Sequence, residues 1–172
     1  MSLSVFIVFV GGILGNELAD SKSLSTLPVA AIVVGTAVSI FPVIRLMSVF
    51  GRKTVFLMIC IYSIALLGLS AFAIITGSFL IFCLSSFLLG ATVATMNQFR
   101  FAAIESVSEE QRATATAIVL LGGLVSAYLG PEVATIGKEI FAINFVGSYI
   151  LLGLLFLIAF ILLCFFQPAK KF

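Results

Sequence analysis

Few side chains in this sequence could do chemistry, and histidine is absent from all 172 residues. Histidine is the commonest metal ligand and the commonest general base, so its absence argues against zinc sites and serine-hydrolase sites. The sequence also contains no P-loop and no Gly-x-Gly-x-x-Gly turn. We therefore predict no enzyme, no metal site and no cofactor.

The most informative polar residues lie in the fourth long apolar stretch. Small and polar side chains recur there at three- and four-residue steps, which places them on one face of a helix. They are Ser86, Gly90, Ala94, Asn97, Gln98 and Phe101. Such a face meets other helices or water rather than lipid. Two interpretations stay open: close packing with hydrogen bonds between helices, or the wall of a water-filled cavity that contacts a solute.

Charged residues near this stretch and near the fifth one have two interpretations each. Arg100 could extend to the cytoplasmic headgroups or line the inner mouth of a pathway. Glu105 follows five residues later, and its candidate ion-pair partners are Arg52, Lys53 and Arg100. Glu132, near the end of the fifth stretch, is either a proton-coupling site or a carboxylate wetted by headgroup water.

Small residues at four-residue spacing predict close contacts between helices. The first stretch contains Gly11 and Gly15, and the fifth contains Gly122, Ser126 and Gly130, followed by Pro131. This spacing lets the backbone of another helix come near, because no large side chain stands between them.

The elements that must position these residues follow from composition. Hydrophobic residues make up 62% of the chain, charged residues 9%, and the mean hydropathy is +1.33. No soluble domain of this length can hide so much apolar surface, so the solvent must be the lipid bilayer. The apolar runs are continuous and about twice the length of β-barrel strands. We predict an all-α membrane protein with six transmembrane helices in a single domain over residues 1–172, at about 3–19, 27–50, 54–76, 78–101, 113–134 and 143–166.

The distribution of positive charge predicts the orientation. Successive spans alternate in direction, so the polar segments between them fall into two sets. One set contains Arg45, Arg52, Lys53, Arg100, Arg112, Lys170 and Lys171, whereas the other contains only Lys22 and Lys138. The positive-inside rule places the first set, and both termini, in the cytoplasm. No stripe of Lys and Arg follows any segment and the net charge is only +2, so we expect no nucleic-acid partner.

Three segments together resemble the major facilitator superfamily, specifically its amino-terminal six-helix half. Gly51-Arg52-Lys53 lies between the second and third spans, where that family has a Gly-x-x-x-Asp-x-x-Gly-Arg-Lys loop. Residues 100–105 and 109–113 resemble the loop between the fourth and fifth spans of bacterial members. Gly130-Pro131 resembles the Gly-Pro motif of the fifth span.

The chain also departs from the family pattern. Ser48 and Ile44 occupy the aspartate and first glycine positions of the loop, and Ser86 stands where the usual arginine of the fourth span falls. These differences weaken the charge network of the loop and put proton antiport by the usual residues in doubt.

The resemblance implies a secondary transporter that moves a small solute across a bacterial inner membrane by alternating access. The cavity candidates are then Ser86, Gly90, Asn97, Gln98 and Arg100, and the cytoplasmic loop motif comprises Gly51, Arg52, Lys53 and Glu105. The family's transport unit resembles two six-helix bundles, of which this sequence supplies one. We therefore expect a second six-helix half, or a homodimer, as partner. The alternative is a non-transporting membrane protein: a split-gene fragment or an assembly partner.

Overall fold

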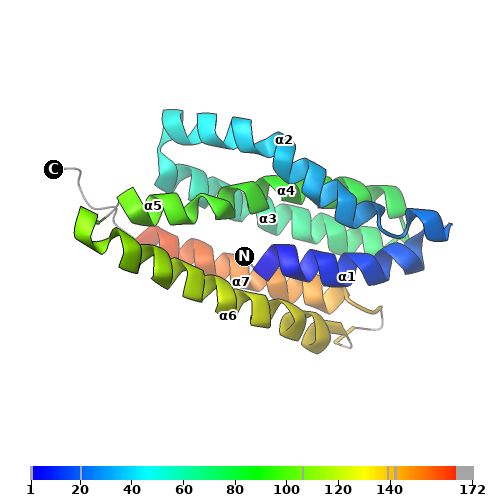
Figure 1. Cartoon of the computed structure of the whole chain (residues 1–172). Helices are drawn as coiled ribbons and strands as arrows, with labels where there is room; N and C mark the ends of the chain where they lie inside the picture. Colours follow the sequence, from blue (N-terminus) through cyan, green and yellow to red (C-terminus); the bar gives the residue numbers. More distant parts are fainter. Residues whose placement is uncertain (1, 20, 106, 139, 142, 166–172) are drawn as a thin grey trace.

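The computed structural model describes residues 2–19, 21–105, 107–138, 140–141 and 143–165, and these contain helices and turns but no strand. The elements in chain order are α1 (Ser2–Leu18), η1 (Lys22–Leu24), α2 (Leu27–Phe50), α3 (Arg52–Ile75), α4 (Phe79–Asn97), α5 (Phe99–Glu105), η2 (Glu109–Gln111), α6 (Arg112–Lys138) and α7 (Val146–Phe165). The long helices run side by side along one axis (Figure 1).

Length and apolar composition identify the membrane-crossing elements. Five segments are long and apolar enough to cross a bilayer: Lys22–Phe50, Arg52–Ile75, Phe79–Glu105, Glu109–Lys138 and Val146–Phe165. Leu3–Leu18 is a shorter apolar helix, about 25 Å long at 1.5 Å per residue. The predicted fold class is confirmed, since the chain is an all-α membrane half-bundle of six helices.

Glycine and proline set the ends of several helices. Gly51 has a φ of 79° and ends α2 immediately before α3 begins, and Gly77 has a φ of 65° in the turn before α4. Both need the left-handed region that glycine enters without steric cost. Pro28 lies in the first turn of α2, where its missing N–H has no intrahelical role.

Two local features differ from the expectations. The fourth apolar segment is interrupted at Gln98, where a turn separates α4 from α5. The fifth continues through Pro131 to Lys138, because a membrane helix tolerates an internal proline when its surroundings satisfy the freed carbonyl.

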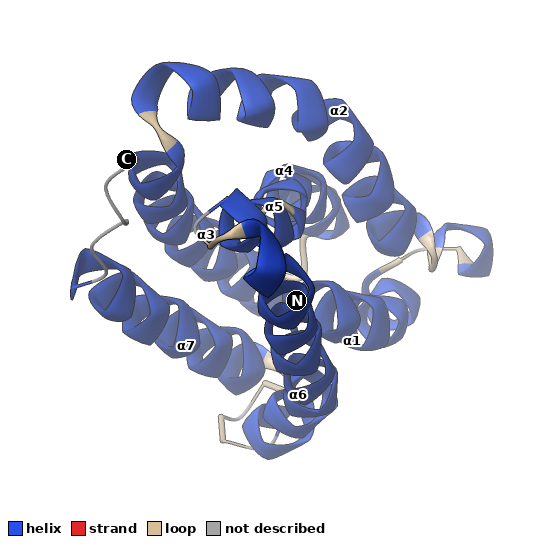
Figure 2. Ribbon diagram, turned by 60° about the vertical axis from the view of Figure 1, so that its left-hand side comes forward, coloured by secondary structure: helices blue, strands red, loops and turns tan. Residues whose placement is uncertain are grey.

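The tightest packing joins α2 to α4 through two glycines. A Cβ atom built on Gly35 would collide with the backbone of Phe87, and one built on Gly90 would collide with the backbone of Gly35 and Thr36. Small residues of this kind let two membrane helices bring their backbones into contact. In Figures 1 and 2, α2 follows one side of α4 in agreement with this contact.

Two further close approaches occur at the opposite end of the bundle from the α2–α3 turn. Gly15 of α1 lies against the backbone of Ser25, and Gly137 of α6 lies against Ser148 of α7. The Ser148 hydroxyl also donates to the carbonyl of Ala134 at 2.8 Å. These contacts fix where α1 meets the following connection and where α6 meets α7.

Replacing Gly90 by alanine should destabilise the bundle, because the new methyl group would force α2 away from α4. We expect a loss of about 1–3 kcal/mol, or a fall of several degrees in the thermal unfolding midpoint in detergent at about 2–4 °C per kcal/mol.

Gly68→Ala in α3 is the matched control, since nothing lies within 4 Å of the added atom. It should keep or raise the midpoint, because alanine favours helix over glycine. Equal midpoints for the two variants would contradict the proposed backbone contact.

Candidate functional site

Buried hydroxyl groups hold α3 and α4 together. The hydroxyls of Ser63 and Thr92 lie 2.8 Å apart, and the Ser70 hydroxyl donates to the Ser85 hydroxyl at 2.9 Å. All four residues are buried. Because their polar atoms have partners inside the protein, this interface is structural. The signal in the sequence is a seven-residue spacing within each helix, between Ser63 and Ser70 in α3 and between Ser85 and Thr92 in α4.

The first three residues of the predicted stripe in α4 are tightly packed. Ser86 and Ala94 are 1% exposed, and the Ser86 hydroxyl donates to the carbonyl of Phe82 at 2.9 Å. Gly90 is buried against α2. These three residues therefore contact other helices, and no open space reaches them in this conformation.

The remaining residues of the same stripe lie at or near the surface. Asn97 and Phe101 are exposed and Gln98 is half-buried, at the break between α4 and α5. Phe99 stacks on Phe56 of α3, with ring centroids 4.2 Å apart and planes at 12°. This stacking joins α5 to α3, while α5 also lies against α6.

The predicted charges of the cytoplasmic loop meet at the same end of the molecule. Arg52 Nη2 lies 2.6 Å from Glu105 Oε1, so Arg52 is the partner among the three candidates. Lys53 Nζ donates to the carbonyl of Cys164 at 3.2 Å, near the end of α7. Gly51 supplies the turn that brings both cations to the start of α3. The start of α3 is thus tied to α5 and to α7.

Two guanidinium atoms at this end have no acceptor. Arg52 Nη1 and Arg100 Nε are buried atoms without a hydrogen-bond partner among the residues that the structure describes. A buried donor without an acceptor costs about 1–3 kcal/mol. The side chain of Arg52 is therefore held through one of its two terminal nitrogens only, by Glu105.

Glu132 lies within α6, one residue after Pro131. Its side chain is half-buried, and no ion pair of Glu132 occurs within the described ranges of the chain. Lys138, at the end of the same helix, lies over the ring of Phe145 instead, with Nζ 5.7 Å from the centroid.

Of the small residues predicted to pack in α6, Gly130 is buried, whereas Gly122 and Ser126 lie at or near the surface. Gly122 is exposed with nothing within 4 Å of an added Cβ, and the Ser126 hydroxyl returns to the carbonyl of Gly122. The buried residues of α6 are Gly130, Ala134 and Gly137. In α1, by contrast, Gly11 and Gly15 are both buried.

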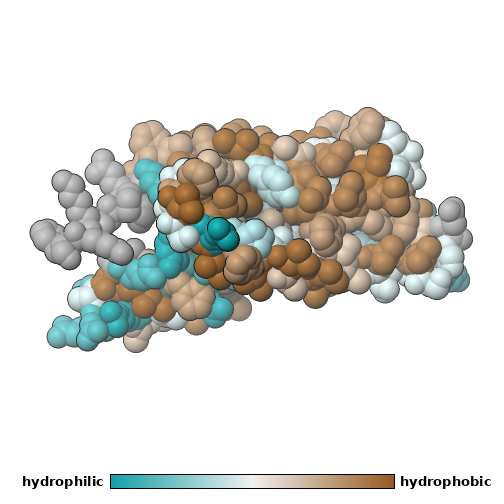
Figure 3. All heavy atoms as spheres, turned by 90° about the horizontal axis from the view of Figure 1, so that it is seen from above, coloured by the Kyte–Doolittle hydropathy of each residue, from teal (hydrophilic) through white to brown (hydrophobic). Residues whose placement is uncertain are grey.

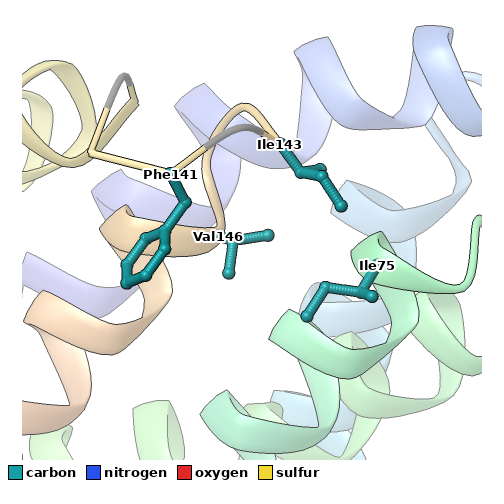
Figure 4. A pocket seen from close by; sticks show the side chains of 4 residues that line it. All are labelled: Ile75, Phe141, Ile143 and Val146. Atoms are coloured by element: carbon teal, nitrogen blue, oxygen red, sulfur yellow. The ribbon is translucent and has the colours of Figure 1, made fainter.

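Two hollows in the surface are apolar and lie apart from the predicted pathway residues. One, of about 210 Å³, is lined by Ile75, Phe141, Ile143 and Val146 between the end of α3 and the start of α7 (Figure 4). The other, of about 270 Å³, lies between α3 and α7. In the described part of the chain, no group of three His, Cys, Asp or Glu side chains could hold a metal ion.

Most of the face seen in Figure 3 is hydrophobic, and the most hydrophilic residues gather toward one end of it. The helices α2 and α6 are among the least buried, and α6 exposes a run of large apolar side chains: Ile118, Leu120, Leu121, Leu124, Val125 and Tyr128. The polar residues left open, such as Asn97, lie at the surface of this half-bundle.

Comparison with known proteins agrees with this architecture. The sequence profile described as Major Facilitator Superfamily matches residues 1–171. The riboflavin transporter RfnT of Brucella anthropi is 33% identical over 87% of this chain and 38% of its own length. The uncharacterized MFS-type transporter YddS of Bacillus subtilis is 31% identical over 96% of this chain and 39% of its own length.

This chain therefore spans less than two fifths of these relatives, and no solved structure matches it significantly. The match to the family profile extends over nearly the whole sequence, and the observed bundle has the six helices that the family's amino-terminal half would require. The chain belongs to the major facilitator superfamily.

Proposed function

We propose that this chain is one half of a secondary transporter that moves a small solute across a bacterial plasma membrane by alternating access. The observation that carries the proposal is the family membership of a six-helix bundle whose stripe of polar residues ends at the surface. A single bundle offers one wall of a pathway, so transport requires a second six-helix bundle or a second copy of this chain.

The second bundle is proposed to cover α2, α4 and α6. Span residues of α3 and α7 carry polar side chains that bond within the bundle, as Ser63, Ser70 and Ser148 do. Asn97 and Glu132, in contrast, lie on α4 and α6 and expose polar atoms. Polar atoms at membrane depth need water or a partner, which places the pathway on that side.

Within this transporter, Glu132 is the candidate for proton coupling and the Asn97–Gln98 pair is the candidate for solute contact. Arg100 and the Arg52–Glu105 pair lie at the inner end, which the positive-inside rule assigns to the cytoplasm together with both termini. Riboflavin is the first solute to test, because a relative at 33% identity is named as its transporter. The alternative is a non-transporting fragment or assembly partner.

Cysteine accessibility tests the position of the pathway. After replacement of Cys60, Cys83 and Cys164 by serine, Asn97→Cys in inside-out vesicles should react with a membrane-impermeant thiol reagent at least about tenfold faster than Ser86→Cys. The reason is that reaction requires water at the thiolate, and Ser86 is 1% exposed.

Glu109→Cys, at an exposed position, serves as the positive control. If it reacts while Asn97→Cys stays as inert as Ser86→Cys, then Asn97 does not face an aqueous pathway.

Uptake tests the transporter itself. Cells that cannot make riboflavin should take up the labelled vitamin when they express this chain with a second six-helix bundle, but not with either bundle alone. Glu132→Gln should lower the rate at least about tenfold if its proton is coupled to transport. Glu110→Gln, an exposed carboxylate before the start of α6, should not lower it.

Uptake by this chain alone would identify a homodimer as the transport unit. Uptake equal to the empty vector, for riboflavin and for a broad panel of other solutes, would reject the transporter in favour of the non-transporting alternative.

A further inference from the structure

The helix α2 is attached to the rest of the bundle through two separate sets of contacts. The half before Pro42, residues 27–41, is called the outer half, and residues 43–50 are called the inner half. The outer half contributes Ile32 to the main buried cluster, which includes residues of α1, α3, α4 and α7. The inner half contributes Val43 and Met47 to a smaller cluster with Val55, Phe56 and Ala94. The division between the two sets falls at Pro42, inside the helix.

Pro42 makes the helix α2 easier to bend at this position. Proline has no N–H, so the carbonyl of Val38 loses its intrahelical donor, and the ring crowds the preceding turn. Val38 is 61% exposed and Phe41 is 73% exposed, so neighbouring helices do not brace the helix here. The helix is visibly bent in Figures 1 and 2.

The two halves differ in how firmly they are attached. The outer half is fixed by the backbone contact of Gly35 with Phe87 and of Gly90 with Thr36, which leaves no space for sliding. The inner half is attached through the side chains of Val43 and Met47 and through the turn at Gly51. Flexible side-chain contacts of this kind separate at lower cost than interlocked backbones.

We propose that residues 43–50 move as a gate about Pro42 while the outer half of α2 stays fixed on α4. This inference rests on the proposed function, because a transporter must open and close the inner end of its pathway. In the observed state Val43 and Met47 belong to the same buried cluster as Ala94 of α4. Outward movement of the gate uncovers this face of α4, one helical turn from Asn97.

Distances between pairs of spin labels, measured by pulsed electron resonance in lipid nanodiscs, test the gate. The inner pair is Val49→Cys with Leu162→Cys, and the outer pair is Val33→Cys with Phe72→Cys, all at exposed positions. In a chain free of native cysteines, the inner pair should give a distribution at least about twice as wide as the outer pair, or split in two.

Pro42→Ala should narrow the inner distribution to the width of the outer one, because Val38 regains its donor. Pro28→Ala is the matched control: it lies in the first turn of the same helix and should leave the inner distribution wide. An inner distribution as narrow as the outer one in the parent chain would overturn the gate. So would a folded Pro42→Ala protein with the inner distribution unchanged.

The two label pairs are compared in a chain that keeps Pro42. Their distance distributions therefore test the gate even if the Pro42→Ala variant does not fold. The measurement also needs neither a solute nor a second bundle. A failed uptake experiment with a wide inner distribution would reject the transporter and keep the hinge, whereas uptake with a narrow inner distribution would reject the hinge alone.

Discussion

A hydrocarbon solvent offers no hydrogen bonds, and this constraint decides where each polar group of the bundle lies. The hydroxyls of Ser63, Ser70 and Ser86 all bond to partners inside the protein. Helices are the backbone conformation that satisfies its own N–H and C=O groups, and the described part of the chain accordingly consists of helices and turns. In the proposed transporter, polar side chains that stay exposed within the spans mark where water or the second bundle would lie.

Lipid also removes most of the hydrophobic force between helices, so packing depends on close fit. The contact of Gly35 with α4 and that of Gly137 with Ser148 bring backbones together where any side chain would collide. The helices fixed in this way form a rigid frame, to which the inner half of α2 is attached more loosely.

Charged residues at the end of the bundle that carries the α2–α3 turn join elements that are far apart in the chain. Arg52 pairs with Glu105, and Lys53 caps the end of α7 through the carbonyl of Cys164. The Arg52–Glu105 pair is partly exposed, so it adds little to stability, on the order of 0–1 kcal/mol. Its value is positional, because it holds the α2–α3 turn beside α5.

The sequence by itself determined the membrane class, the number of helices and the family, because apolar length and loop motifs are local properties of the chain. It also placed Arg52 and Glu105 among candidate partners. Only the tertiary structure decided that Arg52 is the one chosen, that Ser86 is packed while Asn97 is open, and that α6 packs through Ala134 and Gly137 rather than Gly122. The periodicity of a helix shows which residues share a face, but not which helix that face contacts. The rotation of each helix and its position along the bundle are set by how closely its small residues fit against the neighbouring helices.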